Sequence, residues 1–455
     1  MEVKKALNGA WTSRWTFILA ATGSAVGLGN IWKFPYITGE NGGGAFVLVY
    51  LVCVGLIGIP VMMAEILLGH RSRMSPINAM RYLSTESGAS RYWSIVGWLG
   101  LLAGILILSF YSVVAGWAIH YLVLAVTGSF THIESQMSGE LFTRFLGNSG
   151  LLIVWHSLFL LMTLAIVAAG VIRGLGMAAR CLMPLLFILL GVLIIYSASI
   201  GDFSQALNFM FHFDIQALTW HSVLTAMGHA FFTLSLGMGA IMAYGAYLPR
   251  DRRTPFSLGK TVLIIAVLDT VIALMAGMVI FPIVFANPAL QPAEGPGLLF
   301  VSLPVAFGGI ALGSLFATVF FFLVIIAALT SAISLIEPTV AWLVETKGYP
   351  RLRITLVLGI LVWMLGLATV FSFNHWADIT LFGKTFFGNL DFLTANIMLP
   401  LGGLLIAVFV GWIMKKPAVA EEVGGLGHPA YCCWYFILSY VSPVLIGIVF
   451  IANLF

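Results

Sequence analysis

Residues 24–36 of the chain read SAVGLGNIWKFPY and carry two glycines, Gly27 and Gly29, in the middle of a long apolar segment. Glycine adopts backbone conformations that other residues avoid, so a helix can unwind at such a pair at low steric cost. A second stretch, FFTLSLGMG at residues 231–239, places Gly237 and Gly239 in a similar apolar setting. The two stretches predict a pair of helices that are interrupted near their middles.

The composition predicts that lipid surrounds most of the chain. Hydrophobic residues occupy 61% of the 455 positions and charged residues only 8%, whereas about 25% of the residues in soluble domains are charged. The net charge of +4 is too small and too scattered to indicate nucleic-acid binding. The four cysteines lie in or beside apolar runs without zinc-type spacing, so we interpret them as ordinary apolar residues.

A bilayer span needs about 20 apolar residues, and eleven such segments can be marked. They predict an all-α polytopic membrane protein with a single transmembrane domain over residues 1–455. The segments are 13–38, 44–70, 95–127, 151–172, 175–200, 221–248, 259–286, 310–344, 354–373, 390–414 and 431–454. The boundary at Arg173 and Gly174 implies a very tight loop between the fourth and fifth segments.

The basic residues predict the orientation of these spans. With the N-terminus inside, all but Lys33, Arg144 and Lys384 of the 21 lysines and arginines fall in the N-terminal tail and the inner loops, notably 71–91 and 250–260. Inner loops of membrane proteins carry such an excess of basic residues. We therefore expect a protein of the cell inner (plasma) membrane with a cytoplasmic N-terminus and an extracytoplasmic C-terminus.

The glycine pairs also predict an internal repeat. Gly27 lies in the first span and Gly237 in the sixth, and each span opens a set of five. Because five is odd, the second set is inverted relative to the first. The repeats would cover about 13–200 and 221–414, with 431–454 outside them. Interrupted segments at matching places in inverted halves indicate a transport site.

A break in mid-membrane exposes chemistry that an ordinary helix hides. Freed carbonyl groups suit a hard cation, and freed N–H groups suit a carboxylate. Two broken helices side by side could therefore hold a zwitterion together with cations. The alternative is that the glycines only allow close packing of helices.

Polar side chains within the spans add to this expectation. Ala327, Thr330 and Ser331 lie on one helix face and offer oxygen ligands, although the two hydroxyls could instead bond to their own helix. Asp269 lies mid-span, where a carboxylate costs about 2.5–3.5 kcal/mol and needs a partner. It could also be a buried structural acid.

The long motif of the first span and the following ENGGGAF at residues 40–46 resemble the first-helix signature of the neurotransmitter:sodium symporters. Residues 231–239 resemble the family's second broken helix, and residues 327–331 its sodium-binding segment. The resemblance covers about residues 10–450 and implies a symporter of the bacterial eleven-helix amino-acid transporter type that works by alternating access. Inverted repeats and midplane binding are known properties of this family. The family implies no enzyme activity, and a monomer would suffice for transport.

The resemblance implies two sodium sites. The first would use main-chain carbonyls and two hydroxyls, from Gly23, Val26, Ala327, Thr330 and Ser331. The second would use the Ala25 carbonyl with the side chains of Asn30, Thr233 and Asp269. In the family the substrate carboxylate completes the second shell, so that ion and amino acid are ligands of each other.

The resemblance also implies where the amino acid binds. Its carboxylate would contact the N–H groups near Leu28 and Gly29 and the Tyr111 hydroxyl. Its ammonium would contact the carbonyls of Ala25, Phe232 and Thr233 and the Ser235 hydroxyl. The side-chain pocket would consist of Ile107, Tyr111, Phe232, Met238, Ser334 and Leu335. Because this pocket carries no charge and methionine is adaptable, we expect hydrophobic neutral L-amino acids, with aromatic ones within reach.

Chloride is not expected to be required. The positions that match the family's chloride site are Tyr50, His229, Thr233, Asp269 and Ala273. Many animal members have a neutral amide where this chain has Asp269, and Ala273 offers no hydroxyl. The acid would supply the negative charge that chloride otherwise provides. His229 could be a proton-linked group or a structural histidine.

The remaining expectations concern gates and supports. Lys33 and Asp391 match the outer gate, and Trp11, Tyr247 and Glu345 could close the cytoplasmic path. Glu65 would brace the unwound part of the sixth helix. In the fifth span Gly174 and Pro184 could unwind and release the first sodium, or form an ordinary proline kink.

Three other functions were weighed against symport. The scattered histidines offer no catalytic or metal cluster for an enzyme, and broken helices imply occlusion, which disfavours a channel. The serious rival is a proton-coupled or exchange-type amino-acid transporter of the same architecture. Loss of the oxygens of Asn30, Asp269, Thr330 and Ser331 would mark that rival, and all four residues are present.

Overall fold

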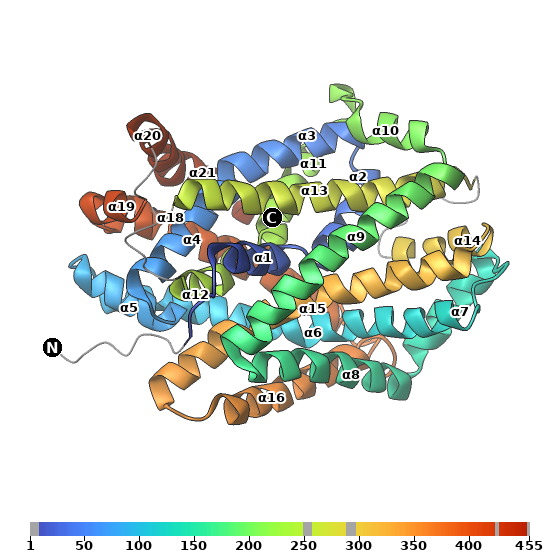
Figure 1. Ribbon diagram of the computed structural model, residues 1–455, viewed down its shortest axis with the longest axis horizontal. Coiled ribbons are helices and arrows are strands. Elements are labelled where there is room, and N and C mark those ends of the chain that lie inside the picture. The colour runs from blue at the N-terminus through green and yellow to red at the C-terminus, as the bar shows by residue number, and fades with distance from the viewer. Residues whose placement is uncertain (1–8, 249–256, 288–296, 424–426, 453–455) are drawn as a thin grey trace.

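The protein is described here by a computed structural model that covers residues 9–248, 257–287, 297–423 and 427–452. Within these ranges it is helical apart from turns and one isolated bridge between Leu381 and Lys384. Most of the long helices run along the long axis of the molecule (Figure 1). Residues 249–256, in one of the predicted inner loops, lie outside the described ranges.

Nine helices in the described part of the chain are long and apolar enough to cross a membrane. Their bounds lie within a few residues of nine predicted segments. They are Gly44–Ser72 (α3, Gly44–Cys53, and α4, Ile59–Ser72), Arg91–Val126 (containing α6, Ile95–Val126), Ser149–Ala168 (α8), Val171–Ile200 (containing α9, Met177–Ile200), Leu258–Phe285 (α13), Gly313–Lys347 (α15), Arg351–Phe371 (α16), Phe386–Ile413 (α17, Phe386–Phe392, and α18, Leu399–Val408) and His428–Ala452 (α20, His428–Phe436, and α21, Ser442–Ala452).

The first predicted span is interrupted. Helix α1 (Arg14–Ala25) ends where Val26 adopts an extended backbone, and a turn of π-helix over Gly29–Lys33 leads into α2 (Phe34–Glu40). A Cβ atom on Gly27 would lie 2.9 Å from the Tyr111 hydroxyl and closer still to the Ser331 hydroxyl. Glycine at this position therefore lets side chains of α6 and α15 reach the break.

The sixth predicted span is interrupted in the same way. Helix α11 (Trp220–Thr233) stops, the chain unwinds over residues 234–239, and α12 (Ala240–Ala246) follows. Gly237 and Gly239 have φ angles of 79° and 73°, a left-handed conformation that favours glycine. The two breaks are in contact, because the Ser235 hydroxyl donates to the Ser24 carbonyl at 2.7 Å.

The bundle is arranged around α15. Of the apolar window of α15, 89% is buried, compared with 28% for the span His428–Ala452 at the edge. Helix α15 packs along α6, and α6 packs along α8. Shorter helices complete the chain, and they are α5 (Pro76–Glu86), α7 (Ser135–Gly147), α10 (Phe203–Phe211), α14 (Leu303–Gly308) and α19 (Lys416–Glu422).

The turn between the fourth and fifth spans lies a few residues before the predicted one. Helix α8 ends at Ala168, the chain turns at Gly170 with a φ of 87°, and a π-helical turn over Val171–Gly176 already belongs to the next span. Gly174 is not at the turn, because it packs against the Ile166 carbonyl. Sequence spacing did not separate a glycine needed for close approach from one needed for a positive φ.

Candidate functional site

The fully buried carboxylate of Asp269 on α13 is the centre of a polar cluster. Its Oδ1 accepts a hydrogen bond from the Asn30 amide at 2.7 Å, and its Oδ2 accepts from the Thr233 hydroxyl at 3.1 Å. The Tyr50 hydroxyl donates to the same Oδ2 at 3.4 Å. The Asn30 amide oxygen in turn accepts from the Gly27 N–H at 3.2 Å. The cluster therefore joins α13 to α3 and to both interrupted helices.

A second polar cluster lies where α15 passes the end of α1. The Ser331 hydroxyl donates towards the Val26 carbonyl at 2.9 Å and the Gly23 carbonyl at 3.4 Å. The Thr330 hydroxyl donates to the Ala327 carbonyl of its own helix at 3.0 Å. The Thr330 Cβ lies 3.2 Å from the position of a Cβ on Gly23. Ser331 therefore reaches across to α1, whereas Thr330 bonds within α15.

A cavity of 30 Å³ lies beside these clusters, at the two breaks. The residues that line it come from both interrupted helices, from α6 and from α15, and they are Ser24, Ala25, Gly27, Leu28, Gly29, Ile107, Tyr111, Phe232, Ser235, Met238, Ser331 and Leu335. None of these lining residues, all within the described ranges, carries a charge. The polar surface of the cavity therefore consists of main-chain groups and side-chain hydroxyls.

Two residues expected to contact the substrate, Thr233 and Ser334, do not line this cavity. The Thr233 side chain bonds to Asp269, beside which it was expected to lie, and the Ser334 hydroxyl donates to the Ser331 carbonyl of its own helix at 2.7 Å. Ser24 and Gly27 line the cavity although they were not predicted to do so. Their contribution depends on how the chain unwinds after Ala25, which the order of residues does not specify.

The first break already holds a partner for its main chain. The Leu28 N–H donates to the Tyr111 hydroxyl at 3.2 Å, so a side chain of α6 meets an N–H group that the interrupted helix leaves unused. Both residues line the cavity. This N–H group and hydroxyl form a polar end in an otherwise largely apolar pocket.

Glu65 holds the second break. The side chain is fully buried on α4, and its Oε1 accepts a hydrogen bond from the Gly237 N–H at 2.6 Å. Hydrogen bonds to a charged acceptor are stronger than neutral ones, and unwound backbone in the membrane interior needs such partners. Glu65 therefore fixes the shape of the unwound loop.

A larger cavity, of 360 Å³, adjoins the small one and is called the outer cavity below. Leu28, Gly29, Tyr111 and Phe232 line both this outer cavity and the small one, so they form the partition between them. Most of the remaining walls are aromatic, with Trp32, Tyr36, Phe110, Trp117, Phe142, Phe373 and Phe387.

The two predicted outer-gate residues face this outer cavity without meeting. Lys33 and Asp391 both line it, yet among the described residues no ion pair joins them. The Lys33 ammonium lies 4.9 Å from the centre of the Phe232 ring, in a cation–π contact. Lys33 thus contacts the partition from the side of the outer cavity.

Aromatic residues pack together at the other end of the interrupted helices, where α1 begins and α12 ends. The Trp11 ring packs edge-on against the Tyr247 ring at 6.0 Å, and the main-chain N–H of Trp11 donates to the Tyr247 carbonyl at 3.0 Å. The Tyr247 hydroxyl donates to Glu337 at 2.8 Å, and Arg351 pairs with the same carboxylate. Glu337 is fully buried and does not reach an aqueous surface.

Glu345 does not join this inner closure as expected. It lies two helical turns beyond Glu337 on α15, and it accepts a hydrogen bond from the Ser75 N–H at 2.9 Å, at the start of α5. Glu337 and Arg351 take the place that was predicted for it. Sequence reasoning missed Arg351, because a residue after a helix break gives no sign of which neighbour it folds back to meet.

The fifth span contacts the second polar cluster beside its proline. Pro184 lies inside α9, and the sulfur of the preceding Met183 is 3.3 Å from the position of a Cβ on Gly23. A cavity of 10 Å³ is lined by Gly23 and Thr330 together with residues of the fifth span such as Leu175. The turn that contains Pro184 and the second polar cluster are therefore neighbours.

His229 is packed between two rings. The Phe34 ring centre lies at 5.8 Å and the Tyr50 ring centre at 5.4 Å, and the side chain is buried. Neither ring nitrogen has a hydrogen-bond partner among the described residues. It lies near Asp269 through Tyr50, and the geometry favours neither of the roles weighed for it.

These features together define a class of protein. Two interrupted helices touch at their breaks, polar clusters lie at both breaks, and a partition that includes two aromatic side chains divides two cavities. Secondary membrane transporters are built in this way. The described part of the chain has the fold of such a transporter.

Comparison with known proteins agrees with this class. The profile of the Sodium:neurotransmitter symporter family matches residues 8–138 and 140–455. The chain belongs to that family, which is a family of transporters and not of enzymes. It is 36% identical to the sodium-dependent transporter YhdH of Bacillus subtilis, covering 97% of this chain and 96% of that one. It is 33% identical to a sodium-dependent transporter of Haemophilus influenzae, covering 98% of each.

Two further relatives have names that mention amino acids. The crystal structure of MhsT in complex with L-phenylalanine superposes with a TM-score of 0.90 at 41% identity, covering 98% of this chain and 100% of that one. The sodium-dependent neutral amino acid transporter B(0)AT2 of Bos taurus is 23% identical, covering 100% of this chain and 73% of that one.

Proposed function

We propose that this protein imports hydrophobic neutral L-amino acids, aromatic ones included, by sodium-coupled symport through alternating access. The observation that carries the proposal is the polar cluster around Asp269. It places a buried carboxylate, an amide and a hydroxyl at both helix breaks, beside a pocket without charge. A cation bound there would lie next to the carboxylate of a zwitterion in the pocket, which couples the two solutes.

Two sodium ions are proposed. One would bind between Asn30, Thr233 and Asp269 with the Ala25 carbonyl, and the substrate carboxylate would complete the shell. The other would bind between α1 and α15, where the Ser331 hydroxyl already lies against main-chain carbonyls. Every atom that would bind a cation in either site is an oxygen, and hard cations prefer oxygen ligands. For the ion between α1 and α15, Thr330 would turn its hydroxyl from its own helix towards the cation.

The pocket supports the proposed substrate class. The Leu28 N–H and the Tyr111 hydroxyl form its polar end and would hold the substrate carboxylate. Ile107, Met238 and Leu335 form apolar walls that suit a hydrophobic side chain. The free volume of 30 Å³ is about that of one water molecule, so the pocket must widen to admit an amino acid. The unwound loop at residues 234–239 is the segment best suited to move, and the phenylalanine complex of MhsT supports an aromatic substrate.

Chloride independence follows from the same carboxylate. Asp269 supplies a fixed negative charge beside the proposed sodium, and Ala273 on the same helix is buried and has no hydroxyl to contribute to an anion site. A second anion at this place would meet the carboxylate at close range. We therefore propose that uptake continues when gluconate replaces chloride.

The topology is part of the proposal. The interrupted segments 14–40 and 220–246 would be the first and sixth of eleven spans, with inverted repeats over about 13–200 and 221–414 in one domain. The N-terminus would lie in the cytoplasm and the C-terminus outside, in the plasma membrane, and a monomer would transport. Phe232 and Tyr111 would open towards the outer cavity, and Trp11 with Tyr247 would open towards the cytoplasm.

Purified protein in liposomes tests the function. An inward sodium gradient should drive accumulation of labelled leucine, tryptophan and tyrosine above equilibrium, and the same gradient made with choline should not. Accumulation driven by an inward proton gradient without sodium would instead support the rival, a proton-coupled transporter. Uptake that needs only an amino acid on the other side of the membrane would support an exchanger.

A further inference from the structure

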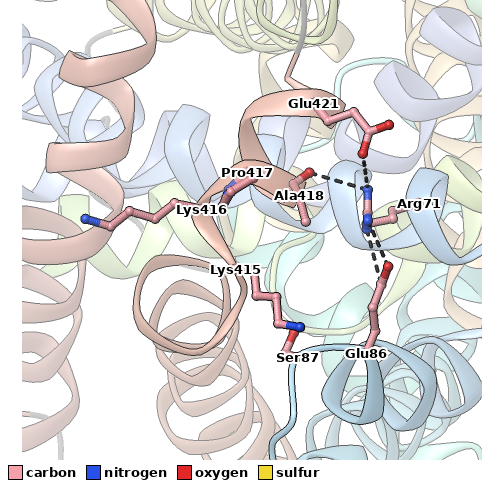
Figure 2. Close-up of a pocket in the computed structure, with 8 residues that line it drawn as sticks. All are labelled: Arg71, Glu86, Ser87, Lys415, Lys416, Pro417, Ala418 and Glu421. Atoms are coloured by element: carbon pink, nitrogen blue, oxygen red, sulfur yellow. Dashed lines mark hydrogen bonds and ion pairs between the residues drawn. The ribbon is translucent and has the colours of Figure 1, made fainter.

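The two segments that flank the span Phe386–Ile413 differ in chemistry. Beside α19, at one end, a cavity of 850 Å³ is lined mostly by charged residues, and Arg71 donates there to Glu86 at 2.8 Å and to Glu421 at 3.2 Å (Figure 2). Surfaces that face water are commonly covered by charged side chains of this kind. The loop at residues 372–385, at the other end, instead exposes large apolar side chains, which are Trp376, Ile379, Leu381 and Phe382.

A tight turn carries the most exposed of these side chains. Main-chain hydrogen bonds join Leu381 and Lys384 in both directions, at 2.9 and 3.1 Å. The Asn389 amide donates to the carbonyl groups of the same two residues, at 2.9 and 2.8 Å. Phe382 at the tip is 88% exposed and has a φ angle of 52°, a left-handed conformation that is unusual for a bulky residue. The turn is therefore fixed in a shape that holds apolar side chains away from the protein.

The turn lies on the face of α17 that points away from the outer cavity. Phe387 and Asp391 line that cavity and are four residues apart, so they share one face of the helix. Asn389, which holds the turn, is two residues from each of them and therefore lies about 200° around the helix. Leu393 follows Asn389 by one turn and is 39% exposed. An exposed apolar side chain on a membrane span faces lipid, so the turn lies beside lipid and not over the cavity.

The lipid-facing side of α16 leads to the same loop. Leu356, Ile360 and Met364 recur every four residues and are exposed. Phe371 lies two turns beyond Met364 on the same side, and its ring packs against the Trp376 ring at 5.2 Å between ring centres. Trp376 therefore lies where the lipid-facing row ends, and aromatic side chains at such places gather at the level of lipid headgroups.

We infer that the tip of this loop, Leu381 and Phe382, inserts into the headgroup region of the outer leaflet and anchors the outer end of α17 at the membrane surface. Exposed apolar surface is unfavourable in water, and lipid is the apolar phase on the side of α17 where Asn389 holds the turn. Because α17 carries Phe387 and Asp391, the anchor fixes one wall of the outer cavity relative to the membrane. The leaflet follows from the proposed orientation, and the inference is independent of the transported ion and amino acid.

The test is a fluorescent probe beside the tip, in the full-length protein reconstituted into liposomes. An environment-sensitive fluorophore is attached to Thr380→Cys, an exposed position next to the turn. The exposed native cysteines are first changed to serine, at Cys181, Cys432 and Cys433. Lipids that carry a nitroxide near the headgroup should quench this probe severalfold more strongly than aqueous iodide does. The matched control carries the probe at Gln136→Cys, an exposed position of α7 on the same side of the membrane in the proposed topology, where iodide should be the stronger quencher.

Substitutions at the tip separate apolar contact from folding. A leucine or phenylalanine that is half buried in the interface shifts the ratio of inserted to free loop roughly tenfold, so Leu381→Ser with Phe382→Ser should shift it roughly 100-fold towards the free loop and remove the quenching by lipid. Leu381→Met with Phe382→Leu keeps the apolar surface and should retain the quenching.

Three outcomes would overturn the inference. The first is iodide quenching at Thr380→Cys that equals the quenching at Gln136→Cys, and the second is lipid quenching that survives the two serine substitutions. The third is protection from iodide that disappears when the protein is diluted in lipid, which would identify a second copy of the chain as the partner of the loop.

Discussion

Replacing Asp269 by asparagine tests the proposed coupling most directly. The substitution keeps the shape of the side chain, and its amide oxygen can still accept from Asn30, which lies at 2.7 Å in the native cluster. What disappears is one negative charge in a fully buried site next to the proposed cation. Folding should therefore be largely preserved while sodium binding weakens.

The size of the effect can be worked from the geometry. Two unit charges about 4 Å apart attract by about 4 kcal/mol at the effective dielectric constant that suits protein sites. The amide oxygen restores part of this as a neutral ligand, and the buried charge no longer has to be desolvated. If the amide ligand and the lower desolvation cost together offset half of the attraction, roughly 2 kcal/mol is lost, which corresponds to about 30-fold weaker sodium binding.

The assay is the sodium dependence of labelled leucine uptake in proteoliposomes, at fixed substrate and in chloride and gluconate media. The half-saturating sodium concentration should rise about 30-fold for Asp269→Asn, and chloride should now improve uptake, because an anion can replace the lost charge. Asp378→Asn, at an exposed position outside the site, is the matched control and should behave like the wild type. An unchanged sodium dependence in Asp269→Asn, with uptake intact, would refute the reasoning.

Three further predictions address the ion between α1 and α15, the unwound loop and the inner closure. Ser331→Ala removes the hydroxyl that lies 2.9 Å from the Val26 carbonyl, and should raise the half-saturating sodium concentration about tenfold in the same uptake assay, whereas Thr163→Ala, which removes a buried hydroxyl bonded to its own helix, should not. Gly237→Ala forces a Cβ onto a residue with φ of 79° and into the Leu399 carbonyl; it should lower the thermal unfolding midpoint by several degrees and raise the KM for tryptophan, while Gly447→Ala, with open space around it, should leave both unchanged. Arg351→Gln leaves the buried Glu337 unpaired and should cost about 3–5 kcal/mol of stability or open the inner path, seen as faster labelling of a cysteine placed at Ala20, which lines the cavity of 10 Å³; adding Glu337→Gln should restore the wild-type rate, and failure to do so would mean that the ion pair does not hold the closure.

Much of the architecture follows from local properties of the chain. Spans of about 20 apolar residues must be helices in lipid, because every main-chain polar group there needs a partner within its own segment. The glycine pairs Gly27–Gly29 and Gly237–Gly239 marked both interruptions. Gly237 and Gly239 adopt positive φ angles that other residues avoid, and Gly27 leaves room for the hydroxyls that reach the first break. The intramembrane polar residues Asn30, Asp269 and Ser331 stood out for the same local reason, since each would be costly without a partner.

Other properties depend on contacts between segments distant in the chain, and residue order alone did not specify them. The direction of the hydroxyl groups on α15 is one such property. The Ser331 hydroxyl reaches across to α1, whereas the Ser334 hydroxyl bonds to its own helix, and the closeness of the two helices sets this difference. The inner closure is another, because Arg351 must fold back across a helix break to reach Glu337, leaving Glu345 to bond with Ser75. Periodicity and composition report what one helix face offers, but the partner that satisfies it is fixed by the packing of the whole bundle.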